Sequence, residues 1–252
     1  MIRSYLFRTL KSYRFVLSIL GVFIVCMLRL TNGAITAADV VGDLDLLVNL
    51  DAFRKVIAVF SAIPFASTFA DEWNNNVTLL YVLRSSAKKY SWSQVLVCFS
   101  ISFLTALSGF LLFIIADSFR LPLYLPDGNP AIPPYGCFLE NNMVYMNLLL
   151  VSVGFSLSCA MWSTTGLLIS SIFPSSFIAF CTPFVASYLL ERITLNFPPQ
   201  FNLLHVALSR INVLNNPWTS FLWVVVVFTV LSLITGKLFV HIVEKRIRNE
   251  IS

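Results

Sequence analysis

The side chains best suited to chemistry or to binding are gathered in one polar stretch, residues 70–93, which reads ADEWNNNVTLLYVLRSSAKKYSWS. Two acids, Asp71 and Glu72, open this stretch. Three bases follow toward its end: Arg84, Lys88 and Lys89. Carboxylates and ammonium or guanidinium groups at the two ends of one segment can form ion pairs, either with each other or with a second protein.

Apolar side chains run through the same stretch at helical spacing. Val77, Leu80, Tyr81 and Arg84 fall at i, i+3, i+4 and i+7, and Lys88 extends the same side. Acids at the start and bases at the end also match the sign of the helix dipole. The pattern predicts a short helix that presents a mixed apolar face with ion-pairing ends. Periodicity alone leaves open whether this face docks on a protein or rests on lipid.

We find no constellation typical of catalysis, nucleotide hydrolysis or metal binding. The chain has no HExxH or GxSxG motif and no phosphate-binding GxxxxGK[ST] loop, since Gly236-Lys237 is followed by leucine. His205 and His241 have no nearby ligand partners, and no two cysteines form a CxxC pair. We therefore expect no catalytic residue, no metal site and no cofactor in this chain.

The composition is that of a membrane protein. Of the 252 residues, 58% are hydrophobic and only 12% are charged, with 23 phenylalanines. Because a helical span needs about 20 apolar residues, the chain can hold roughly six spans and no further soluble domain of any size. The cysteines lie mostly in apolar segments, which is typical of small core residues and not of a disulfide framework.

Six apolar segments predict an all-α, polytopic, single transmembrane domain covering residues 1–252. The predicted spans are about 15–30, 56–70, 95–116, 144–170, 177–190 and 218–240. Pro174 marks the turn between the fourth and fifth spans, within a long gap without charges between Glu140 and Glu191. Solvated charges are expected at the membrane borders, where Asp117, Arg120, Glu140 and Glu191 fall.

Residues 1–14 are predicted to form an amphipathic helix in the headgroup region. Ile2, Leu6 and Leu10 recur at helical spacing, and the bases lie largely on other sides, where they can meet anionic lipid. A simple basic flank to the first span is the alternative. A cleaved signal peptide is a poorer interpretation, because Arg29 interrupts the apolar run before any convincing cleavage site.

The charge distribution predicts the orientation. If the N-terminus lies in the cytoplasm, the inner segments carry 11 Lys or Arg against 4 acids, and the outer segments carry 6 bases against 8 acids. The positive-inside rule then predicts that both termini are cytoplasmic. The expected location is the inner or plasma membrane. The same distribution accounts for the net charge of +5, so a nucleic-acid partner is not expected.

This order of elements resembles the permeases of the type 2 family of ATP-binding-cassette (ABC) transporters. The resemblance is carried by the basic leader, the six spans, the Phe69-Ala-Asp-Glu72 turn after the second span, the basic Arg84–Tyr90 stretch and the outer segment 191–217, which contains FNLLHVALSRI. It implies a coupling helix between spans 2 and 3 that inserts into a separate ATPase subunit. The docking residues it implies are Asp71, Glu72, Val77, Leu80, Tyr81, Arg84, Lys88 and Lys89.

The resemblance also implies the remaining partners. ATP and Mg would be held by the ATPase subunits, and the permease would work as a homodimer or as a heterodimer with a similar chain. The expected role is export of an amphipathic substrate, a peptide or a lipid-like molecule, because phenylalanine, leucine and hydroxyl groups would wall the cavity between the two chains. The alternative is a non-transporting membrane assembly factor or scaffold that binds a soluble cytoplasmic partner.

A stripe of small hydroxyl side chains is the candidate translocation path. Ser152, Ser156 and Ser163 lie along one side of the fourth predicted span. Small residues of this kind more often let helices pack closely than line a path, so both interpretations stay open at this point. No acid or base falls at a predicted span centre, which argues against a proton relay or an ion-coupled carrier.

Overall fold

The computed structural model describes residues 2–31, 37–126, 134–208, 212–213 and 216–251; the side chains of residues 29–31, 79, 84, 250 and 251 lie outside the description. The described residues form α-helices and no strand. The helices are α1 (Ile2–Leu10), α2 (Tyr13–Thr31), α3 (Val40–Asn49), α4 (Asp51–Ala62), α5 (Thr68–Asn74), α6 (Val77–Arg84), α7 (Ala87–Ser118), α8 (Gly136–Glu140), α9 (Val144–Ile172), α10 (Ser176–Thr194), α11 (Leu203–Ala207) and α12 (Pro217–Ile251).

Four of these helices are long and apolar enough to cross a membrane: α7, α9, α10 and α12. The pair α1 and α2, bent by 60° at Lys11 and Ser12, adds a fifth if it counts as one span. The prediction of a helical membrane protein is thus confirmed. Each predicted span from the third to the sixth lies within one of the four long helices.

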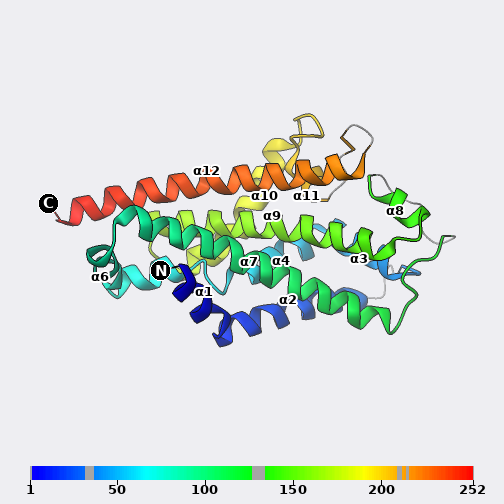
Figure 1. The fold of residues 1–252 in the computed structure, drawn as a ribbon, viewed down its shortest axis with the longest axis horizontal. Coiled ribbons are helices and arrows are strands. Elements are labelled where there is room, and N and C mark those ends of the chain that lie inside the picture. The colour runs from blue at the N-terminus through cyan, green and yellow to red at the C-terminus, as the bar shows by residue number, and fades with distance from the viewer. Residues whose placement is uncertain (1, 32–36, 127–133, 209–211, 214–215, 252) are drawn as a thin grey trace.

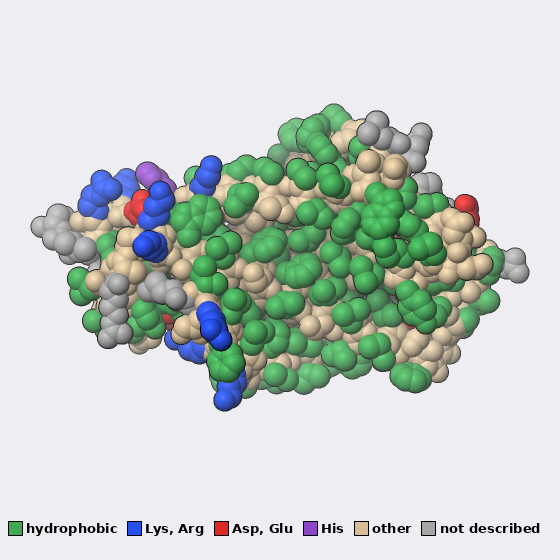
Figure 2. All heavy atoms as spheres, in the orientation of Figure 1, with side chains coloured by type: hydrophobic (Ala, Val, Ile, Leu, Met, Phe, Trp, Pro, Cys, Tyr) green, Lys and Arg blue, Asp and Glu red, His purple; other side chains and the backbone are tan. Residues whose placement is uncertain are grey.

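The long helices run side by side along the long axis of the molecule (Figure 1). Helix α9 is central and packs against α7, α12, α10 and α4. Helix α1, the short α6 and the C-terminal end of α12 lie at one end of this bundle, and α3 and α8 lie at the other (Figure 1). Lys and Arg side chains gather at the end that holds α1 and α6, and an apolar surface covers the middle (Figure 2).

The second predicted span, 56–70, is not one helix. Helix α4 ends at Ala62, turn residues 63–67 follow, and α5 begins at Thr68. Pro64 lies in this turn, and proline has no backbone N–H to donate to the carbonyl four residues earlier. The amides of Phe65 and Ala66 instead bond to the carbonyl of Ala62. A proline thus interrupts the helix shortly before the acids of the polar stretch.

The segment 38–55 alternates acids with branched apolar residues, and one side of it packs into the core. Val40, Leu44 and Leu47 of α3 are buried within the main apolar cluster. Asp39 caps α3 by accepting a hydrogen bond of 2.8 Å from the amide of Gly42. The cap fixes where the helix begins, and the apolar side of α3 then covers one end of the bundle.

Candidate functional site

The polar stretch folds into three helices where the sequence predicted one. Asp71 and Glu72 belong to α5, which is separated from α6 by Asn75 and Asn76. Asn76 has a φ of 57°, in the left-handed region that asparagine tolerates better than most residues. The acids therefore do not begin the predicted docking helix, although α6 itself confirms a helix through residues 77–84.

The bases at the far end are divided in the same way. Helix α6 ends at Arg84, and Ser86 caps α7 by accepting a hydrogen bond of 3.3 Å from the amide of Lys89. Lys88 and Lys89 are exposed in the first turn of α7, so they do not follow the apolar face of α6. The side chain of Arg84 lies outside the described residues.

Glu72 is the centre of the best-developed polar cluster at this end of the bundle. Its side chain is buried, with 7% of the residue exposed. One carboxylate oxygen, Oε2, accepts hydrogen bonds from Tyr5 Oη at 3.2 Å, Tyr90 Oη at 2.7 Å and Gln94 Nε2 at 2.8 Å. The other, Oε1, accepts from the exposed Arg8 guanidinium at 3.3 Å. Glu72 thereby joins α5 to both α1 and α7.

Tyr81 connects α6 to this cluster. Its ring stacks on that of Tyr90, with centroids 6.1 Å apart and an interplanar angle of 17°. It also packs against the ring of Tyr5, at 5.8 Å. Val77 and Tyr81 line a cavity of about 370 Å³ that Arg8 and Glu72 share. The inner side of α6 therefore rests on the two tyrosines that hold the Glu72 carboxylate.

The outer side of α6 has no such packing against the residues that the structure describes. Leu80 is exposed, and Leu83, which lies outside the predicted face of Val77, Leu80, Tyr81 and Arg84, is 81% exposed. The predicted face is thus split, because Tyr81 turns into the protein and the leucines turn away from it. Spacing could not separate the two sides, since apolar residues occupy both.

Asp71 points to a different set of partners. Its carboxylate accepts hydrogen bonds from Ser176 Oγ at 2.6 Å and from the Arg14 guanidinium at 3.4 Å. Both Asp71 and Arg14 are about half exposed, so we expect this ion pair to contribute little to stability. Asn74 donates to the carbonyl of Pro174 at 3.0 Å. Through these bonds α5 also touches α2 and the turn between α9 and α10.

Burial raises the pKa of the Glu72 carboxyl above its ordinary value of 4.5, since water no longer solvates the charge, and the bonds from Tyr90, Tyr5 and Arg8 offset only part of this. A carboxyl whose pKa is higher in the folded than in the unfolded state stabilises the folded protein at low pH. This contribution is lost as the pH rises from the unfolded-state pKa through the folded-state pKa.

We expect the melting temperature of the purified protein to decline from this source as the pH rises above 4.5, and Glu72→Gln to flatten that decline. Melting curves at several pH values would contradict the assignment if the two proteins gave parallel profiles.

The three serines proposed for a path lie inside the protein. Ser152, Ser156 and Ser163 are each at most 1% exposed on the central helix α9. Ser156 donates to the carbonyl of Ser152 at 2.7 Å, and Ser163 accepts from Ser102 Oγ of α7 at 2.6 Å. In this arrangement the stripe packs between helices, and its use as a path stays a prediction.

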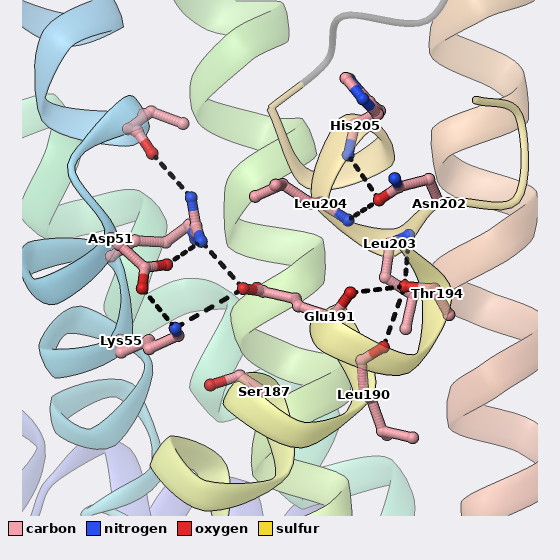
Figure 3. A network of polar contacts seen from close by, with 12 residues as sticks. Asp51, Lys55, Ser187, Leu190, Glu191, Thr194, Asn202, Leu203, Leu204 and His205 are labelled. Carbon is pink, nitrogen blue, oxygen red and sulfur yellow. Dashed lines mark hydrogen bonds and ion pairs between the residues drawn. The ribbon is translucent and has the colours of Figure 1, made fainter. Parts of the chain in front are cut away.

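The sequence did not predict a second polar cluster, which lies between the start of α4 and the end of α10. Glu191 was expected to be solvated at a membrane border, yet it is buried together with Arg54 and Lys55. Arg54 donates to Glu191 Oε2 at 2.9 Å, and Lys55 lies 3.8 Å from the same oxygen (Figure 3). Asp117, another expected border charge, is also fully buried. The sequence shows that these charges lie beside apolar runs, but it does not show that Arg54 pairs with Glu191, 137 positions away.

Compared with known proteins, the chain matches no family model, no curated protein and no solved structure. The functional assignment therefore depends on the geometry of the sites and on the sequence pattern.

Proposed function

We propose that this chain is the transmembrane subunit of an ATP-driven exporter of the ABC type 2 class, which moves an amphipathic peptide or lipid-like substrate. In this proposal α2 and the broken segment 56–70, which runs from α4 into the first turn of α5, complete six crossings with the four long helices, and both termini are cytoplasmic. Helix α6 is the coupling helix, at the basic end of the molecule (Figures 1 and 2). A separate ATPase subunit binds ATP and Mg, and the permease works as a dimer.

The observation that carries the proposal is the two-sided character of α6. Leu80 and Leu83 face away from the protein, as a surface that receives a partner requires. On the opposite side Tyr81 packs on Tyr5 and Tyr90, which hold Glu72. A push on α6 would therefore be transmitted through packed rings and hydrogen bonds to α1, α5 and α7 at once.

The docking surface is tested with the full-length chain purified together with its ATPase subunit. We expect Leu83→Asp to reduce copurification of the ATPase about ten-fold or more, because a charge placed in an apolar contact cannot be solvated there. Leu125→Asp is the matched control, since Leu125 is exposed and lies well outside α6. If Leu83→Asp retained the ATPase as well as the control did, α6 would not be the docking element.

Transmission is tested separately from docking. We expect Tyr81→Ala to retain the ATPase but to uncouple its hydrolysis rate from transport in vesicles, and Tyr81→Phe to restore coupling because it keeps the stacked ring. Unchanged coupling in Tyr81→Ala would remove this contact from the mechanism. A partner that binds α6 without hydrolysing ATP would instead favour the assembly-factor alternative.

A further inference from the structure

The ions between α4 and α10 include more buried positive than buried negative charge. Arg54 and Lys55 are 5% and 4% exposed, and among the described residues Glu191 is the only buried acid that contacts them. Asp51 accepts from Arg54, and from Lys55 at 2.7 Å (Figure 3). The side chain of Asp51 is nevertheless 60% exposed to solvent. Each of the two buried cations therefore has an acid partner, but one of the two acids is largely exposed to solvent and offsets the buried positive charge less than a buried acid would.

A third cation and a hydrogen-bond donor without a partner among the described residues lie in the same cluster. Arg192, exposed at the end of α10, lies over one side of the Tyr188 ring at 5.6 Å, and Lys55 lies over the same ring at 4.6 Å. The Nε of Arg54 is buried and has no hydrogen-bond partner among the described residues. A buried donor without an acceptor usually signals a group that is satisfied by something outside the chain.

These side chains line a cavity of about 280 Å³. Its charged wall is formed by three cations and two acids, Arg54, Lys55, Arg192, Asp51 and Glu191, which leaves an excess of one positive charge. Leu195, Leu204 and Leu208 contribute an apolar wall. Helix α11 supplies Leu204, and Asn202 caps that helix by accepting from the Leu204 amide at 2.9 Å (Figure 3). The volume is just below the range of pockets that hold a whole drug-sized molecule, so it fits a head group better than a complete amphiphile.

The surface that continues from the cavity is apolar. On α10, Val185, Leu189 and Ile193 are exposed, on a helix that is long and apolar enough to cross a membrane. Acyl chains can lie along such a face while a phosphate reaches the cations at its end. Basic pockets between membrane helices can bind acidic lipid head groups.

We propose that the cavity between α4, α10 and α11 binds the phosphate of an anionic phospholipid, with the acyl chains along the exposed face of α10. Arg54 and Lys55 supply fixed positive charge, the free Nε of Arg54 supplies a donor, and Arg192 closes the site from the exposed side. The site acts whether or not an ATPase is bound, so it does not depend on the function proposed above.

The test measures lipid binding to the purified full-length chain in detergent, by native mass spectrometry and by the shift in melting temperature. We expect phosphatidylglycerol to bind and to stabilise the protein more than phosphatidylcholine does. Arg192→Gln should weaken the apparent affinity for phosphatidylglycerol about five-fold, the effect typical of one base near an acidic lipid. Arg192 is exposed and makes no buried ion pair with the described part of the chain, so this variant should fold.

Two controls keep the result specific. Arg120→Gln removes an exposed arginine outside the cavity and should leave phosphatidylglycerol binding unchanged, and Arg192→Lys should retain most of it. Equal binding of the two lipids, or equal loss in Arg192→Gln and Arg120→Gln, would overturn the proposal. Competition by millimolar inorganic phosphate that fully displaced the lipid would assign the cavity to a free anion and overturn the lipid assignment.

Discussion

Replacing Glu72 with alanine is expected to lower the free energy of unfolding of the purified protein by about 2–4 kcal/mol, because buried donors lose their shared acceptor. Tyr5, Tyr90 and Gln94 all donate to the same carboxylate oxygen. The Arg8 guanidinium is largely exposed and can be solvated after the change, so most of the effect comes from the three uncharged donors. Thermal or chemical unfolding in detergent measures the loss.

Glu72→Gln is the matched variant, since its amide oxygen still accepts from the tyrosines. We expect it to cost less than half of the alanine effect. Because the cluster links α5 to α1 and α7, protease cleavage in residues 75–86 should also speed up in Glu72→Ala and not in Glu72→Gln. Equal stability of the two variants would mean that the carboxylate does not hold these helices together.

The second large effect is expected at Gly166, where α9 passes closest to α10. A Cβ on this residue would lie 2.7 Å from the backbone carbonyl oxygen of Ala179. Pro183, four residues after Ala179, has no N–H with which to hold that carbonyl inside α10. Because Gly166 has no side chain, there is room beside it for the carbonyl oxygen of Ala179, which receives no helical hydrogen bond from Pro183.

We expect Gly166→Ala to lower the free energy of unfolding by about 1–2 kcal/mol, since overpacking costs more than the better helix propensity of alanine returns. Gly236→Ala is the control, because the nearest atom there, at 2.8 Å, belongs to the Val95 side chain and can move. That variant should change stability little. If both variants unfolded at the same temperature, the approach of α9 and α10 at Ala179 would be looser than described.

Local properties of the sequence were enough to predict that this is a helical membrane protein and to predict most of its helices. The apolar runs predicted the four long helices, because a run of about 20 apolar residues is stable across a bilayer only as a helix. The spacing of Val77, Leu80 and Tyr81 predicted α6, and the basic leader predicted a helix that the structure places at Ile2–Leu10. The break after α4 also has a local signal in the sequence, Pro64, although the apolar run 56–70 predicted an unbroken span.

Only the tertiary structure decided which charges meet. Glu72 finds Tyr5 across 67 positions, and Arg54 finds Glu191 across 137. The same sequence pattern, an acid or base beside an apolar run, fits both a solvated border charge and a buried ion pair. Hydropathy and periodicity depend on neighbours in the chain, whereas a buried partner depends on which helices pack together and at what rotation. That arrangement is set by side-chain packing across the whole bundle, so it turns Arg54, Lys55 and Glu191 inward and leaves Leu80 and Leu83 exposed.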